Sequence, residues 1–361
     1  MNEDKKFRPV YWDFEKDCLI ILDQRKLPNR EVWLEIKTLS QVIRAIKNLS
    51  VRGAPLLGVV AAYGVYIGVR KFRGNPEAFY MKLKDTIEKI SNTRPTAVNL
   101  FSSLRRIQEI TEFTETSTTD KMKLDILEMA HRILEEEERR SLAISRNGAD
   151  ILDTSVRVLT HCNAGALAVG GVGTALGIIY EAYRRGYVEM VFVDETRPLL
   201  QGARLTAWEL ERWNIPYKVI TDSSAAFLMS QGLVDVVIVG ADRIVRNGDV
   251  ANKIGTYSLA IAASKHRIPF IVAAPTSTFD LSLLDGEKIK IEYRNQDEVL
   301  SFAGKRIAPK NASAYTPAFD ITPAKYVSAI VTERGVIEKP DIYKVAAHIS
   351  GGVYATDVAE L

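Results

Sequence analysis

Residues 160–177 read THCNAGALAVGGVGTALG, and this stretch decides the fold. An apolar run at 156–159 leads into it, three polar or reactive side chains (Thr160, His161 and Cys162) follow at once, and the remainder is almost wholly Gly, Ala and Val. We expect a strand that ends in reactive groups and turns into a helix of small residues. Such a helix lets a ligand approach the backbone, and its N-terminus offers free N–H groups to an anion. Tight helix–sheet packing also selects small residues, so the glycines alone leave both interpretations open.

Short apolar runs alternate with helical segments on the C-terminal side of this stretch. The runs occupy residues 156–159, 190–193, 218–220, 236–239 and 270–273, and a late one lies near 328–332. Alternation of strand and helix predicts right-handed crossovers and a parallel, doubly wound sheet. Runs that are apolar throughout are typical of strands covered on both faces.

The N-terminal part of the chain has a different pattern. Residues 7–36 favour short strands, and from Ser40 onward apolar residues recur at the three- and four-residue spacing of helices. Residues 121–146 predict one long helix with a charged, solvated face. We therefore expect two domains, a small β unit with a helical bundle over residues 1–147 and the parallel sheet over residues 148–361.

Composition excludes several classes of protein. The 361 residues are 47% hydrophobic and 26% charged with a net charge of +3, so no electrostatic feature indicates nucleic acid or an anionic membrane as a partner. The two cysteines, Cys18 and Cys162, are too few for a disulfide framework or a zinc cluster and fit a reducing cytoplasm. The charged N-terminus has no apolar signal region, and no run approaches the roughly 18 apolar residues of a membrane span.

Reactive side chains follow four of the five main apolar runs. They are His161 and Cys162 after the first, Asp194 and Arg197 after the second, Asp222 after the third, and Asp242, Asn252 and Lys253 after the fourth. Ligands of doubly wound sheets bind outside the carboxyl ends of the strands. Such a concentration of reactive groups at one rim predicts a functional site there.

Each candidate has an alternative interpretation. Cys162 is either a buried structural cysteine or, at a strand end before a helix, a stabilised thiolate. Asp242 follows the apolar run VDVVIVGA, where desolvation would raise its pKa and suit a general acid, but it could instead pair with Arg243 or cap a helix. Lys253 could bind a phosphate, or it could simply lie at the start of a helix without binding a ligand. We expect His161 to be packed or hydrogen-bonded rather than to act as a base.

Two arginines of the N-terminal part, Arg52 and Arg94, lie beside glycine or proline turns and are further phosphate candidates. Together with the reactive rim they suggest a cleft that closes on a phosphorylated substrate. A dinucleotide site is disfavoured, because Leu176 occupies the place of the third glycine after Gly171 and Gly173. The four histidines show no metal-ligand spacing.

Nine longer motifs extend this interpretation. They are LDQRKLP (22–28), VRGAP (51–55), TRPTAVNL (93–100), THCNAGALA (160–168), DETRP (194–198), QGARLTAWEL (201–210), VGADRI (239–244), NGDVANKIGTY (247–257) and PAFDITP (317–323). The set resembles the methylthioribose-1-phosphate isomerase family, which is shared with the regulatory subunits of translation initiation factor 2B. The likeness runs from about residue 10 to about residue 340.

The resemblance implies an α/β fold, with an N-terminal β/helical-bundle domain (1–147) followed by a Rossmann-like doubly wound parallel-sheet domain that carries a C-terminal tail (148–361). It implies that 5-methylthio-D-ribose 1-phosphate, an aldose, is converted to 5-methylthio-D-ribulose 1-phosphate, a ketose, in methionine salvage. It also implies a homodimer, with no metal and no organic cofactor.

By motif match, Asp242 is the proton donor and Cys162 the second catalytic group. The residues implied to bind the substrate, chiefly its phosphate and hydroxyls, are Arg52, Gly53, Ala54, Arg94, Gln201, Asn252 and Lys253. Leu199, where the family often has arginine, and residues 223–225, Ser-Ser-Ala instead of Asn-Met-Ala, depart from the pattern. The tail beyond residue 340 has no counterpart in it.

The implied chemistry needs an acid, because a phosphate on C1 blocks ordinary opening of the sugar ring. Protonated Asp242 would deliver a proton to the ring oxygen as the C1–O bond breaks. A hydrogen must then move from C2 to C1, either as a proton removed by the Cys162 thiolate through an enolate or as a hydride. Apolar surroundings of Asp242 mildly favour the hydride, since they would exclude exchangeable water.

Three other functions compete with this one. A ribose 1,5-bisphosphate isomerase would share the thiol and the acid but would need a second cationic pocket for the phosphate on C5. A non-catalytic regulatory subunit that binds nucleotides or partner chains would have no need to retain both Cys162 and Asp242. A redox sensor built on Cys162 would need a resolving cysteine, and the sequence has none nearby.

Overall fold

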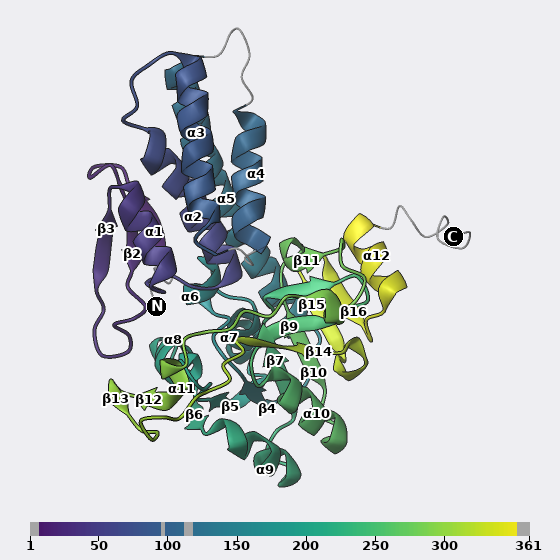
Figure 1. The fold of residues 1–361 in the computed structure, drawn as a ribbon. Helices are drawn as coiled ribbons and strands as arrows, with labels where there is room; N and C mark the ends of the chain where they lie inside the picture. Colours follow the sequence, from purple (N-terminus) through teal and green to yellow (C-terminus); the bar gives the residue numbers. More distant parts are fainter. Residues whose placement is uncertain (1–6, 95–97, 112–117, 352–361) are drawn as a thin grey trace. The chain divides into compact units, whose positions relative to one another are not determined.

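The computed structural model describes residues 7–94, 98–111 and 118–351, and the chain divides into two compact units (Figure 1). The first unit comprises Met1–Leu142 and Gly165–Gly173, and the second comprises Ala143–Ala164 and Thr174–Leu361. The change of sequence pattern suggested a boundary after residue 147. The contacts place it earlier, after Leu142, and they assign the small-residue segment Gly165–Gly173 to the first unit.

The first unit combines a small sheet with a helical bundle. Its antiparallel strands, in the order β1-β2-β3, are β1 (Val10–Asp13), β2 (Cys18–Leu22) and β3 (Trp33–Ile36). Its helices are α1 (Leu39–Lys47), α2 (Ala54–Val69), α3 (Pro76–Ser91), α4 (Val98–Ile110), most of α5 (Thr119–Ala149) and the short α6 (Ala166–Val169). Pro95, expected to start a helix, lies outside the described residues.

Helix α2 is the centre of this unit. It is buried almost all round and contacts α1, α3, α4 and α6, which explains why its sequence, APLLGVVAAYGVYIGV, has no polar face. The surrounding helices are amphipathic and begin at clear caps. Thr38 and Gln41 form a capping box at the start of α1, and Asn75 caps α3 just before Pro76.

The second unit is built on a seven-stranded sheet in the order β16-β15-β10-β7-β4-β5-β6. The strands are β4 (Val156–Thr160), β5 (Val188–Asp194), β6 (Tyr217–Ile220), β7 (Val236–Val239), β10 (Phe270–Ala273), β15 (Ala329–Thr332) and the antiparallel edge strand β16 (Gly335–Glu338). All the other strands are parallel. The predicted parallel, doubly wound sheet is confirmed, and every apolar run identified in the sequence coincides with one of its strands.

Both faces of this sheet are covered, and successive residues of a strand point to opposite faces. In β7, Val237 and Val239 pack in a cluster with residues of α9 (Ala225–Ser230) and α10 (Thr256–His266), whereas Val236 and Ile238 pack in a second cluster with residues of α7 (Ala175–Arg184), α8 (Ala207–Arg212) and the end of α5. Two covered faces are the reason why the runs are apolar throughout.

A second sheet, in the order β11-β8-β9-β14, follows the fourth strand of the main sheet. Its strands are β8 (Arg243–Val245), β9 (Val250–Lys253), β11 (Phe279–Asp280) and β14 (Phe319–Thr322). The remaining elements of the unit are α11 (Asp297–Leu300), the hairpin β12 (Ser301–Phe302) and β13 (Lys305–Arg306), and α12 (Ile342–Ser350). Sequence patterns indicated only a loop or a helix start at Lys253, which is the last residue of β9 and pairs with Phe319 of β14.

The stretch at 160–177 does not form the continuous helix that was expected. After β4 the chain forms only four helical residues in α6, turns at Gly170 (φ 88°) and Gly173 (φ 105°), and then begins α7. These positive φ values suit glycine and interrupt a helix. The expectation that a helix N-terminus would stabilise a Cys162 thiolate is therefore wrong, because four residues supply little of a helix dipole.

The order of the main sheet reverses between β4 and β7. The chain proceeds outward from β4 through β5 and β6 on one side, and through β7, β10 and β15 on the other. Val158 lies opposite Val236, and the Thr160 hydroxyl donates a 2.8 Å hydrogen bond to the Ile238 carbonyl. Ligands bind at such a switch point in doubly wound sheets, and Cys162 and Asp242 follow the two strands that flank it.

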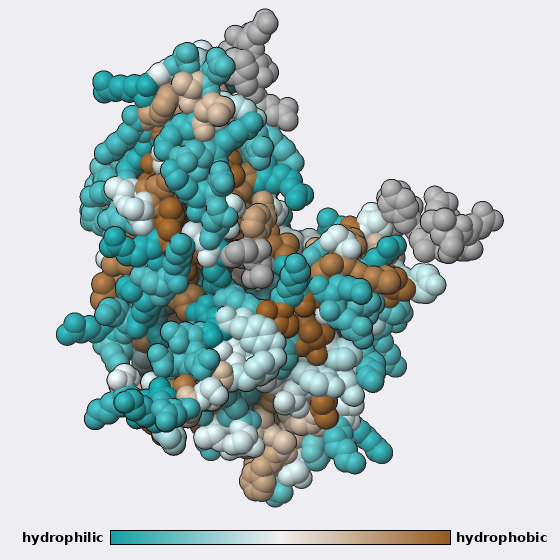
Figure 2. Space-filling model, viewed as in Figure 1, coloured by the Kyte–Doolittle hydropathy of each residue, from teal (hydrophilic) through white to brown (hydrophobic). Residues whose placement is uncertain are grey.

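Hydrophilic residues cover most of the surface in the view of Figure 2, and hydrophobic residues occur in scattered patches. No helix in the described ranges combines the length and the hydropathy needed to cross a membrane.

The loops after β4 and β7 approach each other so closely that a side chain would not fit between them. A Cβ atom at Gly240 would lie 2.7 Å from the Cβ of Ala164. We expect Gly240→Ala to lower the free energy of unfolding by about 1–3 kcal/mol in urea titrations. Replacing Ala164 with glycine in the same chain removes the opposing methyl and should restore most of the loss. Wild-type stability of the single variant would contradict this close approach.

Candidate active site

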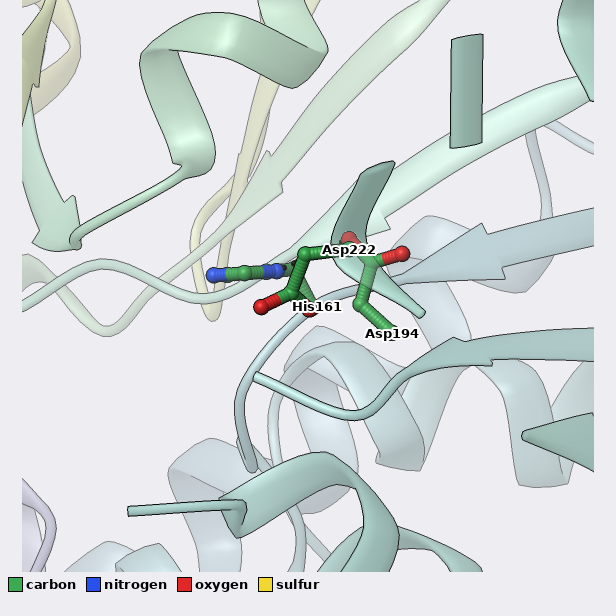
Figure 3. Close-up of side chains that lie close together, drawn as sticks. All are labelled: His161, Asp194 and Asp222. Atoms are coloured by element: carbon green, nitrogen blue, oxygen red, sulfur yellow. Dashed lines mark hydrogen bonds and ion pairs between the residues drawn. The ribbon is translucent and has the colours of Figure 1, made fainter. Parts of the chain in front are cut away.

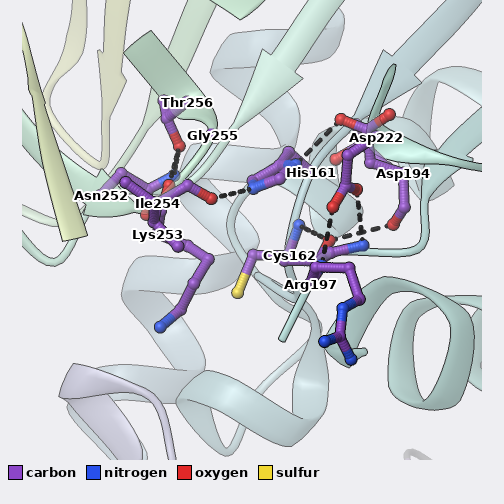
Figure 4. Close-up of polar contacts among 12 residues, drawn as sticks. His161, Cys162, Asp194, Arg197, Asp222, Asn252, Lys253, Ile254, Gly255 and Thr256 are labelled. Atoms are coloured by element: carbon purple, nitrogen blue, oxygen red, sulfur yellow. Dashed lines mark hydrogen bonds and ion pairs between the residues drawn. The ribbon is translucent and has the colours of Figure 1, made fainter. Parts of the chain in front are cut away.

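Cys162, which Figure 4 shows beside His161, is held in an unusual backbone conformation by two threonines. Its φ is +63°, a left-handed value that is uncommon for residues other than glycine and costs about 1–2 kcal/mol. The Cys162 N–H donates to the hydroxyl of Thr196 at 2.9 Å, and the hydroxyl of Thr206 donates to the Cys162 carbonyl at 2.6 Å. The side chain is half-buried. Backbone strain of this kind, fixed by its surroundings at a reactive residue, indicates a functional position.

Asp242 occupies the corresponding place after β7. Its N–H donates to the Ala251 carbonyl at 2.9 Å, which fixes its backbone against β9. The residue is half-buried, so the apolar run before it desolvates the carboxyl only in part. Cys162 and Asp242 thus occupy the ends of two adjacent parallel strands.

Lys253 lies close to both reactive groups. Only 8% of the residue is exposed, its Nζ donates to the Ala318 carbonyl at 2.8 Å, and the same atom lies 4.7 Å from the centre of the Phe319 ring. Burial lowers the pKa of Lys253, while the charges of Cys162 and Asp242 act in the opposite direction. Figure 4 shows the side chains of Cys162 and Lys253 pointing to the same side of their loops.

The two predicted amide ligands are also buried in this unit. Asn252 is 5% exposed, and its amide nitrogen donates to the Thr256 hydroxyl at 3.0 Å. Gln201 is 6% exposed, and within the described parts of the chain its Oε1 has no hydrogen-bond partner. A buried acceptor of this kind ordinarily has a partner, so Gln201 is suited to receive a ligand hydroxyl.

Lys253 also lines a pocket of about 230 Å³ within the second unit. The other lining residues are Arg197, Pro198, Leu199, Ile254, Arg294, Glu298, Val299, Tyr315, Thr316, Pro317 and Ala318. The Arg294 guanidinium is paired with Glu292 at 2.8 Å and with Glu298 at 3.2 Å, so its charge is largely compensated. The pocket therefore combines the buried ammonium of Lys253 and the guanidinium of Arg197 with mostly apolar walls.

His161 is hydrogen-bonded, as expected, and lies beside Asp194 and Asp222 (Figure 3). One ligand atom from each of these three residues lies within 4.8 Å of the others, a spacing that a metal ion could bridge. However, the His161 Nδ1 already bonds Asp194, and the two oxygens of Asp222 accept the N–H groups of Thr196 and Arg197, each at 2.7 Å. The nitrogen and oxygen atoms that would bind a metal are therefore already engaged in hydrogen bonds that hold the loops. This arrangement does not fit a metal centre.

The remaining predicted residues belong to the first unit. Gly53 (φ 96°) ends the loop before α2, and a Cβ there would lie 2.4 Å from the carbonyl oxygen of Ala168 in α6. Only glycine fits this close approach, which fixes Arg52 and Ala54 on either side of it. Arg94 follows α3 and is half-buried. Cys162 and four other predicted residues (Asp242, Gln201, Asn252 and Lys253) thus belong to the second unit. The remaining four, Arg52, Gly53, Ala54 and Arg94, belong to the first unit.

Sequence reasoning gave no role to the residues that hold this arrangement. Thr196 and Thr206 were visible inside the quoted motifs, but nothing in their spacing indicated that they bond the backbone of Cys162. The same applies to the Ala318 carbonyl that accepts from Lys253, which lies 65 residues away along the chain.

Comparison with known proteins agrees with this geometry. A sequence model of the Initiation factor 2 subunit family matches residues 50–339. The methylthioribose-1-phosphate isomerases of Anaeromyxobacter sp. (strain Fw109-5) and Aquifex aeolicus (strain VF5) are each 50% identical to the chain; the alignments cover 92% and 94% of it, and 95% and 70% of those proteins.

Solved structures of similar fold come from the same family. The 5-methylthioribose 1-phosphate isomerase from Pyrococcus horikoshii OT3 has a TM-score of 0.89 at 41% identity, over 96% of this chain and 97% of that one. A structure described as translation initiation factor eIF-2B, subunit delta, from A. fulgidus has a TM-score of 0.82 at 41% identity, over 94% and 99% of the two chains. The chain belongs to the methylthioribose-1-phosphate isomerase family, within the wider initiation factor 2 subunit family.

Proposed function

We propose that this protein converts 5-methylthio-D-ribose 1-phosphate to 5-methylthio-D-ribulose 1-phosphate in methionine salvage. The observation that carries the proposal is the pair Cys162 and Asp242, a thiol and a carboxyl at the ends of the two strands that flank the switch point. The 50% identity to curated isomerases supports the same reaction.

Asp242 acts as the general acid in this proposal. The phosphate on C1 prevents ring opening through a free aldehyde, so the C1–O bond breaks as Asp242 protonates the ring oxygen. The hydrogen on C2 then moves to C1, either through the Cys162 thiolate as base or as a hydride. In both routes the hydrogen lost by C2 is balanced by the one gained by C1, so the reaction needs no external oxidant or reductant.

Binding of the substrate is assigned to two sets of residues. In the second unit, Lys253 supplies a positive charge for the phosphate, and the amides of Gln201 and Asn252 bind oxygen atoms of the substrate. In the first unit, the Arg52-Gly53-Ala54 loop and Arg94 supply further donors for the phosphate. The unpaired Oε1 of Gln201 supports its part in this assignment.

The apolar walls of the pocket beside Lys253 favour the methylthio sugar over ribose 1,5-bisphosphate. A second phosphate would need positive charge beyond that of Lys253; of the two arginines in the lining, Arg294 is paired with Glu292 and Glu298, and Arg197 donates to the carbonyls of Pro198 and Val299. Leu199, where arginine is common in the family, lines the same pocket and adds apolar surface. The non-catalytic alternative is disfavoured because both Cys162 and Asp242 are retained.

We also propose that the protein is a cytoplasmic homodimer with no nucleic-acid or membrane partner. Cys18 and Cys162 are both free thiols, which fits a reducing compartment. Sedimentation analysis tests the dimer.

Turnover of 5-methylthioribose 1-phosphate, followed by chromatography of the ketose, tests the reaction. We expect Asp242→Asn and Cys162→Ser each to lower kcat by about 10²–10⁴-fold, because each removes a group that acts on the reacting atoms. Asp150→Asn, which changes an exposed carboxylate paired with Arg185, is the matched control and should keep wild-type activity. Full activity of Asp242→Asn would exclude the proposed mechanism, and turnover of ribose 1,5-bisphosphate alone would reassign the substrate.

The lowered pKa of Lys253 predicts a pH dependence of substrate binding. The protonated ammonium attracts the phosphate, so KM should rise at alkaline pH as the proton is lost, over a range that begins lower than for an ordinary lysine. Lys253→Arg keeps the charge over this range and should remove most of the alkaline rise, even if its KM is higher throughout. The same alkaline rise in both proteins would show that another group causes it.

A further inference from the structure

His161 is buried between two hydrogen-bond acceptors. Its Nδ1 lies 2.9 Å from Oδ2 of Asp194, its Nε2 lies 2.9 Å from the carbonyl oxygen of Ile254, and only 1% of the residue is exposed. A neutral imidazole carries one N–H and can donate to only one of these acceptors, whereas an imidazolium donates to both. When Asp194 is ionised, both bonds can therefore form only if the ring is charged.

The charges around His161 favour its protonated form. Carboxylates face it from three elements: Asp194 from β5, Asp222 from the turn after β6, and Asp320 from β14. Burial lowers the pKa of His161, but the bond and charge of Asp194, the Ile254 carbonyl and the charge of Asp222 outweigh it and raise the pKa above its ordinary value.

The ring of His161 joins three chain segments. It belongs to the residue before Cys162, its Nδ1 bonds the end of β5 at Asp194, and its Nε2 bonds the residue after Lys253 at the end of β9 (Figure 4). The ring is also packed tightly, because a Cβ atom at Gly255 would lie 2.9 Å from its Cε1. Loss of the Nε2 bond would remove this link between the end of β9 and the loop that carries the thiol.

A second series of hydrogen bonds also links Asp194 to the loop of Cys162. The backbone carbonyl of Asp194 accepts from the Thr196 hydroxyl at 3.0 Å, and that hydroxyl accepts from the N–H of Cys162. Asp194 is therefore linked to the thiol loop twice, directly through its side chain and indirectly from its backbone through the Thr196 hydroxyl. Neither His161 nor Asp194 has a part in the proposed reaction itself.

We propose that His161 is a positioning residue of the isomerase: as an imidazolium paired with Asp194, it fixes Lys253 at the end of β9 relative to the Cys162 thiol. The proposal rests on the proposed function and deepens it. The ring holds Lys253, which binds the phosphate, and Cys162, which acts on the reacting carbon, in one fixed arrangement. Its loss should therefore affect both substrate binding and the chemical step.

Steady-state kinetics of His161→Asn test this role. We expect KM to rise and kcat to fall, each about tenfold, because a charged hydrogen bond that held two site residues is lost. His131→Asn is the matched control, since His131 is a partly buried histidine of the first unit that bonds the hydroxyl of Tyr63 at 2.8 Å. This control should lose stability without a change in KM. Unchanged KM and kcat in folded His161→Asn would overturn the proposal.

The protonation state of the ring is measured separately from activity. Two-bond ¹H–¹⁵N spectra of histidine-labelled protein should show both ring nitrogens of His161 protonated at about pH 8, above the ordinary pKa of a histidine. Asp194→Asn keeps the size of the side chain and should return His161 to a neutral ring, and it carries the same kinetic test if His161→Asn does not fold. A neutral His161 in the wild type would overturn the proposal.

These two measurements separate this proposal from the proposed function. If the wild type does not turn over 5-methylthioribose 1-phosphate, the proposed function fails, whereas the ring spectra still decide whether His161 is the charged link between β4, β5 and β9.

Discussion

Strands β4 and β7 run side by side with Val158 opposite Val236, and this parallel pairing is the constraint on which the rest of the structure depends. The pairing sets the two strand ends level, so that the loops carrying Cys162 and Asp242 leave the sheet at the same edge. Because the sheet order reverses at this pair, no crossover helix lies over the gap between the two loops. Gly240 and Ala164 then bring the loops into contact. Cys162 and Asp242, 80 positions apart along the chain, thereby follow the ends of two adjacent strands.

Much of this arrangement could be predicted from the sequence. Runs such as 236–239 are apolar at every position because both faces of the sheet are covered, and a strand of that kind is recognisable without its neighbours. The rule that ligands bind at the carboxyl ends of parallel strands then identified Cys162 and Asp242 as candidates. The inference of the sheet succeeds because it depends on local composition, whereas the assignment of Cys162 and Asp242 as site residues stays a prediction.

Other features could not be predicted, because they depend on partners distant in the chain. Lys253 is part of a strand only because β9 pairs with β14, and Asn252 and Lys253 are buried as a result. The left-handed conformation of Cys162 follows from bonds to Thr196 and Thr206, which no local pattern indicates. The small-residue stretch after Cys162 resembled a helix in composition, yet Gly170 and Gly173 turn the chain there.

The assignment of Gly165–Gly173 to the first unit has a consequence for how the protein can be divided. The chain enters the second unit at Ala143, leaves it after Ala164 and returns at Thr174, so neither unit is a single continuous segment. A fragment that stopped at Leu142 would lack α6, whose Ala168 packs against Gly53, and would expose that part of its core. No single cut in the chain therefore yields two complete units. A truncation or gene fusion designed as if each unit were one continuous segment would leave both units incomplete.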